Sequence, residues 1–342
     1  MKIQKIELTQ EKIKLKVPFV TALREVHFAE FIRVKVLCND GSFAYGEAPA
    51  TKAITGETLE SISENIERIK EKFCGLGIDE ALALLHTQKI GSSAKAALDI
   101  AFVTLGAKEK ALSLAEYFCI KNSAPIQTDI TISLGSQEQM LQDAKQALCE
   151  GMDILKIKLG SDIEHAVAVS KLLSQELPQA TLLIDANQAW SLEESFVYVD
   201  ALKGYDIELL EQPVKAKELH FLKQIRQKST FAILADEAVF TLEDMKRVVQ
   251  TGAADMINIK VMKCGGVSKA VSMLEYAREK GIVCMLGSMI EGPYSINLTL
   301  YLAFAYRDVV QYIDLDSPLL YEKLPSELDF VYKGAMLSFK DQ

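Results

Sequence analysis

Seven positions between residues 158 and 314 follow one another at nearly constant intervals, and they constrain the fold more than any other feature. Each position ends a short apolar run, and successive positions are 24 to 27 residues apart. They are Lys158, Asp185, Glu211, Asp236, Lys260, Gly287 and Asp314. One strand, one helix and their connections fill such an interval. The spacing therefore predicts repeated strand–helix units that place chemistry at the C-terminal ends of strands.

Strands and helical segments alternate strictly from Ile126 onward. Eight strands are predicted, over residues 126–133, 154–159, 181–186, 207–211, 231–236, 256–260, 282–287 and 311–315. Amphipathic segments such as Gln137–Glu150 separate them. Eight strands with intervening helices favour an α/β fold, a (β/α)7β-type TIM barrel over residues 123–316. A doubly wound open sheet is the alternative, but no Gly-x-Gly-x-x-Gly motif opens a helix.

The first third of the chain has a different pattern. Apolar and polar residues alternate as in half-buried strands over residues 2–8, 12–17, 29–38 and 42–48. The segment between Pro18 and Phe28 breaks this alternation and is predicted to be a loop. Helical spacing follows over Glu57–Phe73 and Ser92–Lys110. Strands followed by helices indicate an α+β module, so we predict a capping domain over residues 1–122 that the C-terminal tail, 317–342, completes.

Composition excludes several kinds of partner. The net charge of −9 argues against nucleic acid and against an anionic membrane surface. No run approaches the ~18 apolar residues of a membrane span, and the first ten residues lack the apolar core of a signal peptide. The six cysteines include no Cys-x-x-Cys pair, which favours reduced thiols. We therefore expect a cytoplasmic protein, and the sequence leaves open whether it forms a homo-oligomer.

Three acidic residues end three consecutive predicted strands, namely Asp185, Glu211 and Asp236. Carboxylates that converge at one rim of a barrel repel one another unless a cation lies among them. An all-oxygen ligand set with few protein ligands fits Mg²⁺, and we expect one Mg²⁺ per chain. Asn187 and Glu237 either support this site or, for Asn187, simply turn the chain. Three unrelated caps or solvent-facing acids are the alternative.

Two lysines, Lys158 and Lys260, end the second and the sixth predicted strands. These strands are opposite one another in an eight-stranded barrel, so the ammonium groups would serve as acid and base on opposite faces of a substrate. The pKa of a free lysine is ~10.4, and it must fall by about three units for the lysine to act as a base near neutrality. Lys156 lies on the same face of its strand as Lys158, and its positive charge would help to lower the pKa of Lys158. A solvated charge is the alternative for each lysine.

The candidate residues lie in five short sequence motifs. The motifs are Lys156-x-Lys158, Asp185-Ala-Asn187, Glu211-Gln-Pro213, Asp236-Glu237, and Lys260 with Gly265-Gly266. Over essentially the whole chain, the set resembles the enolase superfamily in its muconate-lactonizing subgroup. The resemblance implies that the three acidic residues hold Mg²⁺ and that Lys158 and Lys260 are the acid–base pair, with the metal stabilising an enediolate. No histidine ends a predicted barrel strand, unlike in the histidine-using subgroup.

The motif Asp314-Leu315-Asp316 narrows the expected substrate. The eighth strand lies opposite the fourth, across the mouth from the metal ligands. Two carboxylates on one face there require a cation at the far end of the substrate, and the α-ammonium of a dipeptide is such a cation. This Asp-x-Asp pair resembles that of dipeptide epimerases. An aspartate pair that caps a turn before Pro318 is the alternative.

Four further residues are candidates for substrate binding. Arg24, in the predicted loop, resembles the epimerase residue that binds a glutamate side chain, although most loop arginines are simply solvated. Ser133 ends the first predicted strand, and Ser288 and Met289 follow the seventh.

The expected activity is that of an isomerase, with a dipeptide as the small-molecule substrate. It would invert the α-carbon of the C-terminal residue, as in L-Ala-L-Glu to L-Ala-D-Glu, by two-base 1,1-proton transfer in peptidoglycan peptide metabolism. An o-succinylbenzoate synthase or a muconate-type cycloisomerase of the same subgroup is the first alternative, and it would leave Asp314 and Asp316 without a cationic partner. A Schiff-base aldolase and a non-catalytic binding barrel are the others.

Overall fold

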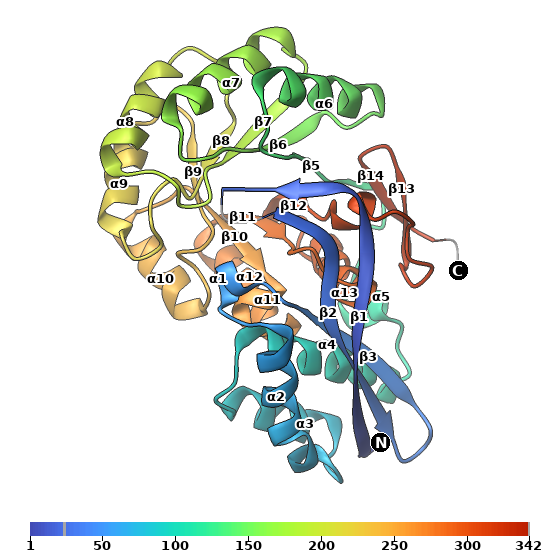
Figure 1. Ribbon diagram of the computed structural model, residues 1–342. Helices are drawn as coiled ribbons and strands as arrows, with labels where there is room; N and C mark the ends of the chain where they lie inside the picture. The colour runs from blue at the N-terminus through green and yellow to red at the C-terminus, as the bar shows by residue number, and fades with distance from the viewer. Residues whose placement is uncertain (23–24, 341–342) are drawn as a thin grey trace.

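The computed structural model describes residues 1–22 and 25–340, which form three sheets (Figure 1). An antiparallel sheet of three strands stands at the N-terminus, an eight-stranded parallel sheet forms the barrel, and a small antiparallel sheet includes the C-terminal strands. No helix in the described ranges is both long enough and apolar enough to cross a membrane. Localisation stays a prediction.

The N-terminal sheet is built on a long hairpin of β1 (Ile3–Val20) and β2 (Glu25–Cys38), followed by β3 (Phe43–Pro49). The predicted loop between Pro18 and Phe28 is wrong for most of its length, because Phe19 pairs with Val26 and Val20 with Glu25. Backbone pairing across two strands does not require alternating side chains, so the broken pattern was no sign of a loop. The hairpin reaches from this sheet to the mouth of the barrel (Figure 1).

Helix α4 (Ser92–Glu109) joins the capping module to the barrel. Ala97 and Ala101 belong to the apolar core of the N-terminal sheet, whereas Ala96 and Ile100 belong to the core around the barrel. Small residues allow this double packing: a Cβ on Gly46 of β3 would lie 1.8 Å from the Ala97 carbonyl oxygen. The other elements of this region are α1 (Lys52–Thr55), α2 (Leu59–Ile69), η1 (Lys70–Phe73), α3 (Ile78–Thr87) and α5 (Leu114–Tyr117).

The barrel strands follow one another in sequence order around the sheet, all parallel. They are β5 (Ile130–Ile132), β6 (Ile154–Lys158), β7 (Thr181–Asp185), β8 (Leu209–Glu211), β9 (Ala232–Ala235), β10 (Met256–Lys260), β11 (Val283–Gly287) and β12 (Val310–Asp314). The helices between them are α6 (Gln137–Cys149), α7 (Ile163–Glu176), α8 (Leu192–Ala201), α9 (Leu219–Lys228), α10 (Leu242–Thr251), α11 (Val261–Cys264), α12 (Val267–Lys280) and α13 (Pro293–Ala305). The predicted (β/α)7β barrel is confirmed.

An apolar layer fills the barrel interior on the side away from the C-terminal ends of the strands. Leu183, Leu209 and Leu234 on neighbouring strands belong to one buried cluster with Met256, Met285 and Tyr312. Side chains two residues further along a strand lie on the same face and one step closer to the C-terminal mouth. Because the layer below is closed by apolar side chains, the polar residues at the strand ends line a dead-ended pocket.

The predicted first strand, 126–133, is two strands in the structure. β4 (Ile126–Gln127) leaves the barrel and pairs with β14 (Met336–Phe339), which also pairs with β13 (Phe330–Lys333). The two C-terminal strands thus form a sheet with β4 that is separate from the N-terminal sheet. The tail reaches that sheet near η2 (Ser317–Leu320), where Leu15 forms a bridge with Tyr321. The division into residues 1–122 with 317–342, and 123–316, stays a prediction.

Candidate active site

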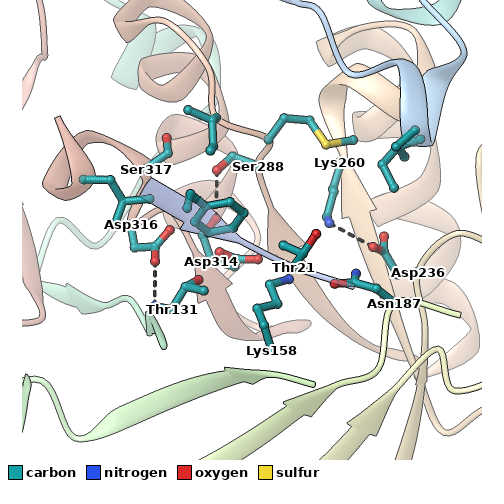
Figure 2. Close-up of a pocket in the computed structure, with 16 residues that line it drawn as sticks. Thr21, Thr131, Lys158, Asn187, Asp236, Lys260, Ser288, Asp314, Asp316 and Ser317 are labelled. Carbon is teal, nitrogen blue, oxygen red and sulfur yellow. Dashed lines mark hydrogen bonds and ion pairs between the residues drawn. The ribbon is translucent and has the colours of Figure 1, made fainter. Parts of the chain in front are cut away.

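A cavity of about 60 Å³ lies at the C-terminal ends of the barrel strands. Lys158 and Lys260 project into it from β6 and β10, with Asp236 and Asn187 at one side and Asp316 and Thr131 at the other (Figure 2). The capping module covers it with Phe19 and Thr21 from the hairpin and Ala53 and Ile54 from α1. Of the predicted strand-end residues, Lys158, Asp236, Lys260 and Asp314 therefore line one covered pocket, whereas Asp185 and Glu211 are buried behind it.

Each of the three predicted metal ligands contacts a lysine. The Nζ–O distances are 2.5 Å for Lys158 and Asp185, 2.8 Å for Lys156 and Glu211, and 2.9 Å for Lys260 and Asp236. All three acids are buried. Burial, with the charge of Asp185, raises the pKa of Glu211, whereas burial of Asp236 is outweighed by the charges of Lys260 and Lys263, which hold its pKa below the usual range.

The three acids suit a hard divalent cation by their chemistry. They offer carboxylate oxygens from adjacent strands, Asp185 and Glu211 being partners in the parallel register. Glu211 Oε2 is buried with Lys156 Nζ at 2.8 Å as its ion-pair partner, and burial together with the charge of Asp185 raises the pKa of Glu211, a cost that a bound cation would relieve. Among the described residues, however, the one acidic trio whose oxygens all lie within 4.8 Å of one another is Asp129, Asp314 and Asp316.

Lys260 carries a proton in this arrangement. Burial disfavours its charged form, but the charge of Asp236 outweighs burial, and the pKa of Lys260 lies above the usual range. The expected fall in pKa therefore requires positive charge at the acidic residues. The charge of Lys156 is paired with acids, because its ammonium group is fully buried between Asp314 at 2.6 Å and Glu211 at 2.8 Å.

Asp314 and Asp316 lie together at the far end of the cavity. Asp314 ends β12, but Asp316 has helical backbone angles and is not part of the strand. The Asp316 carboxylate accepts a hydrogen bond from the backbone N–H of Thr131 at 2.7 Å. Through Lys156, the carboxylate of Asp314 is connected to Glu211 across the barrel.

The other predicted substrate residues have different positions. Ser288 and Met289 line the cavity. The Ser133 hydroxyl accepts a hydrogen bond from the backbone N–H of Val20 at 3.3 Å, so it fixes the end of β1 to the barrel. Arg24 lies outside the described residues, and its role, like that of Ser133, stays a prediction.

Asn187 and Glu237 stand next to the acidic residues. Asn187 has a φ of 45°, and its backbone N–H donates to Asp185 Oδ1 at 2.9 Å. Its side-chain amide donates to Glu237 at 3.5 Å. Burial, followed by the charge of Asp236, raises the pKa of Glu237 to about 8. Asn187 thus both turns the chain and orients Asp185, so the two readings of this residue are compatible.

Two residues that the sequence analysis missed hold the acidic side chains. Asn258 donates from Nδ2 to Glu211 Oε1 at 2.8 Å, and Lys263 lies 2.5 Å from Asp236 Oδ1. Asn258 could have been found by counting two residues back from Lys260 along β10. Lys263 belongs to the one-turn helix α11, so strand alternation gives no signal for it.

Residues 139–342 match a protein family described as enolase C-terminal domain-like. An L-amino acid-D/L-Glu epimerase from Sulfurimonas denitrificans is 54% identical over 335 residues, which is 98% of each chain. An L-Ala-D/L-Glu epimerase from Bacillus subtilis is 35% identical, over 99% of this chain and 94% of that one. These relatives confirm the predicted enzyme class, an isomerase of the racemase and epimerase type.

Solved structures agree with the fold. A substrate-liganded complex of the Bacillus subtilis L-Ala-D/L-Glu epimerase superposes with a TM-score of 0.93 at 34% identity, over 99% of this chain and 97% of that one. A dipeptide epimerase from Enterococcus faecalis, complexed with Mg and L-Leu-L-Tyr, has a TM-score of 0.92 at 32% identity, over 100% and 98% of the chains.

Proposed function

Since the chain belongs to the enolase C-terminal domain-like family, we propose that it is a Mg²⁺-dependent epimerase that inverts the α-carbon of the C-terminal residue of a dipeptide. The observation that carries the proposal is the order of charges along one covered cavity. Acidic residues stand at both ends, and Lys158 and Lys260 project between them from opposite strands (Figure 2). A zwitterionic substrate of two residues matches this order.

The far acidic pair supports a dipeptide over the substrates of the alternative functions. The ammonium of a dipeptide can form charge-assisted hydrogen bonds with Asp314 and Asp316. An o-succinylbenzoate synthase or a cycloisomerase would bury these carboxylates, which are 6% and 4% exposed, without a cation from the substrate.

The two lysines divide the proton transfer between them. One lysine, in its neutral form, removes the α-proton, and the other, protonated, delivers a proton to the opposite face. The carboxylates of Asp185 and Asp236 orient the two ammonium groups through the contacts at 2.5 and 2.9 Å. The apolar side chains of Phe19, Ile54 and Met289 exclude water from the cavity.

Asp185, Glu211 and Asp236 would hold the Mg²⁺. When bound, the ion supplies positive charge that stabilises the negative charge developing on the substrate carboxylate and lowers the pKa of the lysines. The solved dipeptide epimerase from Enterococcus faecalis, which contains Mg and a dipeptide, supports this assignment.

Arg24 is proposed to select the side chain that lies next to the inverted carbon. The described residue Thr21, three positions before Arg24 in the sequence, lines the cavity. A guanidinium favours a carboxylate partner, so L-Ala-L-Glu should be among the best substrates. The name of the Sulfurimonas denitrificans relative, which specifies only the D/L-Glu part of its substrate, supports relaxed choice at the N-terminal residue.

An exchange experiment in D₂O tests the proposed substrate. Each member of an L,L-dipeptide library is incubated with the Mg²⁺-loaded enzyme, and loss of the α-proton is followed by NMR. L-Ala-L-Glu should exchange and epimerise, whereas its N-acetyl derivative should be a much poorer substrate. The variant Arg24→Ala should lower kcat/KM for L-Ala-L-Glu by ~10- to 150-fold, the loss of one charge-assisted contact, and spare hydrophobic dipeptides.

Three results would count against parts of the proposal. Equal turnover of N-acetylated and free dipeptides would remove the role given to Asp314 and Asp316. Unchanged activity of Arg24→Ala on L-Ala-L-Glu would remove the specificity claim alone. Trapping of a substrate on a lysine by borohydride would replace epimerisation by Schiff-base chemistry.

A further inference from the structure

One acidic residue beneath the far end of the cavity has no role in the mechanism above. Asp129 is fully buried, and neither of its carboxylate oxygens has a hydrogen-bond partner in the described part of the chain. A carboxylate oxygen of Asp129 lies within 4.8 Å of oxygens from both Asp314 and Asp316. A buried carboxylate without partners is costly, so this group needs either a proton or a cation.

The backbone fixes Asp129 below the pocket. It lies two residues before Thr131, just ahead of β5, and its carboxylate lies close to those of Asp314 and Asp316. Its N–H donates to the carbonyl of Ile313 at 2.9 Å. The neighbouring Thr128 hydroxyl donates to the same carbonyl at 3.1 Å and accepts from the N–H of Leu315 at 3.0 Å. These bonds hold Asp129 against the segment that carries Asp314 and Asp316.

The charges around Asp129 do not balance. Asp314 and Asp316 face it, and Lys156 is the nearest cation, with Glu211 behind it. Lys156 already contacts Asp314 at 2.6 Å and Glu211 at 2.8 Å, so its charge is shared. The other titratable groups that face the cluster are Lys158, Lys260, Glu291, Tyr321 and Tyr332.

The directions of the pKa shifts agree with an excess of negative charge. Burial, then the charges of Asp314 and Asp316, raises the pKa of Asp129 well above its usual range. Burial and the charge of Asp314 raise the pKa of Asp316 to about 6. For Asp314 itself, the cost of burial is outweighed by the charges of Lys156 and Lys260, and its pKa is lowered. A proton held by the cluster would therefore reside on Asp129 or Asp316.

We propose that the cluster of Asp129, Asp314 and Asp316 holds one proton in the free enzyme and releases it to solvent when the ammonium of the dipeptide binds. The inference rests on the proposed function. One O–H bond of a carboxylic acid breaks, the proton passes to the buffer, and the ammonium replaces its charge; no covalent bond to the substrate forms. Asp129 is thus a positioning residue that acts through Asp314 and Asp316.

The exchange of one cation for another has a definite dependence on pH. Where the free cluster holds its proton, the affinity for a dipeptide should rise about tenfold for each pH unit, because one proton leaves on binding. Above the pKa of the cluster the affinity should be constant. In the variant Asp129→Asn the dependence should be lost near pH 7, and KM should rise about 10-fold with kcat nearly unchanged, since proton transfer occurs at the lysines.

Titration calorimetry measures the released proton. The Mg²⁺-loaded wild type is titrated at pH 7 with a pre-equilibrated mixture of L-Ala-L-Glu and L-Ala-D-Glu, so that epimerisation adds no heat. Two buffers with different ionisation enthalpies give the number of protons released, which should be about one for wild type and near zero for Asp129→Asn. Asp153→Asn is the matched control: Asp153 precedes β6 at the end away from the cavity, and this variant should release the proton as wild type does.

The outcomes separate the inference from the proposed function. Binding and turnover of the dipeptide without proton release by wild type would overturn the inference alone, and this measurement does not depend on the folding of any variant. Binding of a second Mg²⁺ per chain that the dipeptide displaces would also overturn it, because the cluster would then be a metal site. Failure of the wild type to bind or epimerise any dipeptide would overturn both proposals.

Discussion

The two ends of the cavity carry the same kind of side chain in opposite electrostatic states. The end of the proposed Mg²⁺ site, the metal end, has the carboxylates of Asp185, Glu211 and Asp236. They face Lys156, Lys158, Lys260 and Lys263. The opposite end, the ammonium end, has the carboxylates of Asp129, Asp314 and Asp316, which share one lysine, Lys156, that also contacts Glu211. The first end is compensated by side chains of the protein itself, whereas the second retains an excess of negative charge.

This difference distinguishes two roles that buried carboxylates can have in a binding site. Carboxylates that are already paired with lysines are held in place before any ion binds, at the cost of keeping the lysines protonated. Carboxylates without enough partners instead favour the arrival of a cation from outside. We infer that the metal end holds the reacting groups in position and that the ammonium end determines which substrates bind.

The metal end should show the largest effect of a single substitution. Asp185→Asn, Glu211→Gln and Asp236→Asn should each lower kcat/KM by ~10³-fold or more, because the developing charge on the substrate would lose its stabilisation. EDTA should abolish the activity of wild type, and added Mg²⁺ should restore it. Circular dichroism of each variant serves as the control for folding. Full activity of the metal-free enzyme would show that the acids at this end are structural only.

The lysines between the two ends should show the next largest effect. Lys158→Ala or Lys260→Ala should stop epimerisation, a loss of ~10²- to 10⁴-fold, because one face of the substrate loses its acid or base. The surviving lysine can still exchange the α-proton of one epimer. NMR in D₂O with separate L,L- and L,D-dipeptides measures this. Equal exchange of both epimers in either variant would contradict the division of the two faces.

A smaller effect should mark the supports of the metal end. Asn258→Ala removes the amide that donates to Glu211 at 2.8 Å but leaves every charge in place. The Mg²⁺ affinity should fall by ~10-fold, as is usual when a residue that orients a ligand is lost. Titration of Mg²⁺ by calorimetry, together with the Mg²⁺ concentration for half-maximal activity, checks the value. An unchanged affinity would mean that Lys156 alone orients Glu211.

Most of the barrel could be predicted because its strands end at regular intervals. Leu183, Leu209 and Leu234 of the apolar layer lie two positions before Asp185, Glu211 and Asp236, and this alternation produces part of the pattern seen in the sequence. The same rule brought the strand-end lysines and acids to one pocket. Prediction failed at residues 126–133, where Thr128 and Asp129 separate two strands that belong to different sheets.

The charge state of the site could not be predicted in the same way. The sequence analysis assigned Lys156 the role of adding positive charge beside Lys158, but in the structure Lys156 pairs with acids from β8 and β12. Such pairing depends on which side chains converge across the barrel, and spacing along one strand does not contain that information. Asp129 lies just before β5 and outside it, so alternation along that strand reveals neither its position nor its lack of partners.

The bond between the Asp316 carboxylate and the Thr131 amide has a consequence for the motions of the barrel. It joins the segment after β12 to β5, at the seam where the last strand meets the first, and the Thr128 hydroxyl joins the same two strands. The seam therefore depends partly on side chains that also face the substrate. Local opening of the barrel should begin there, and a bound dipeptide should slow it. Hydrogen exchange of the Thr131 amide then reports occupancy of the pocket from a single backbone position.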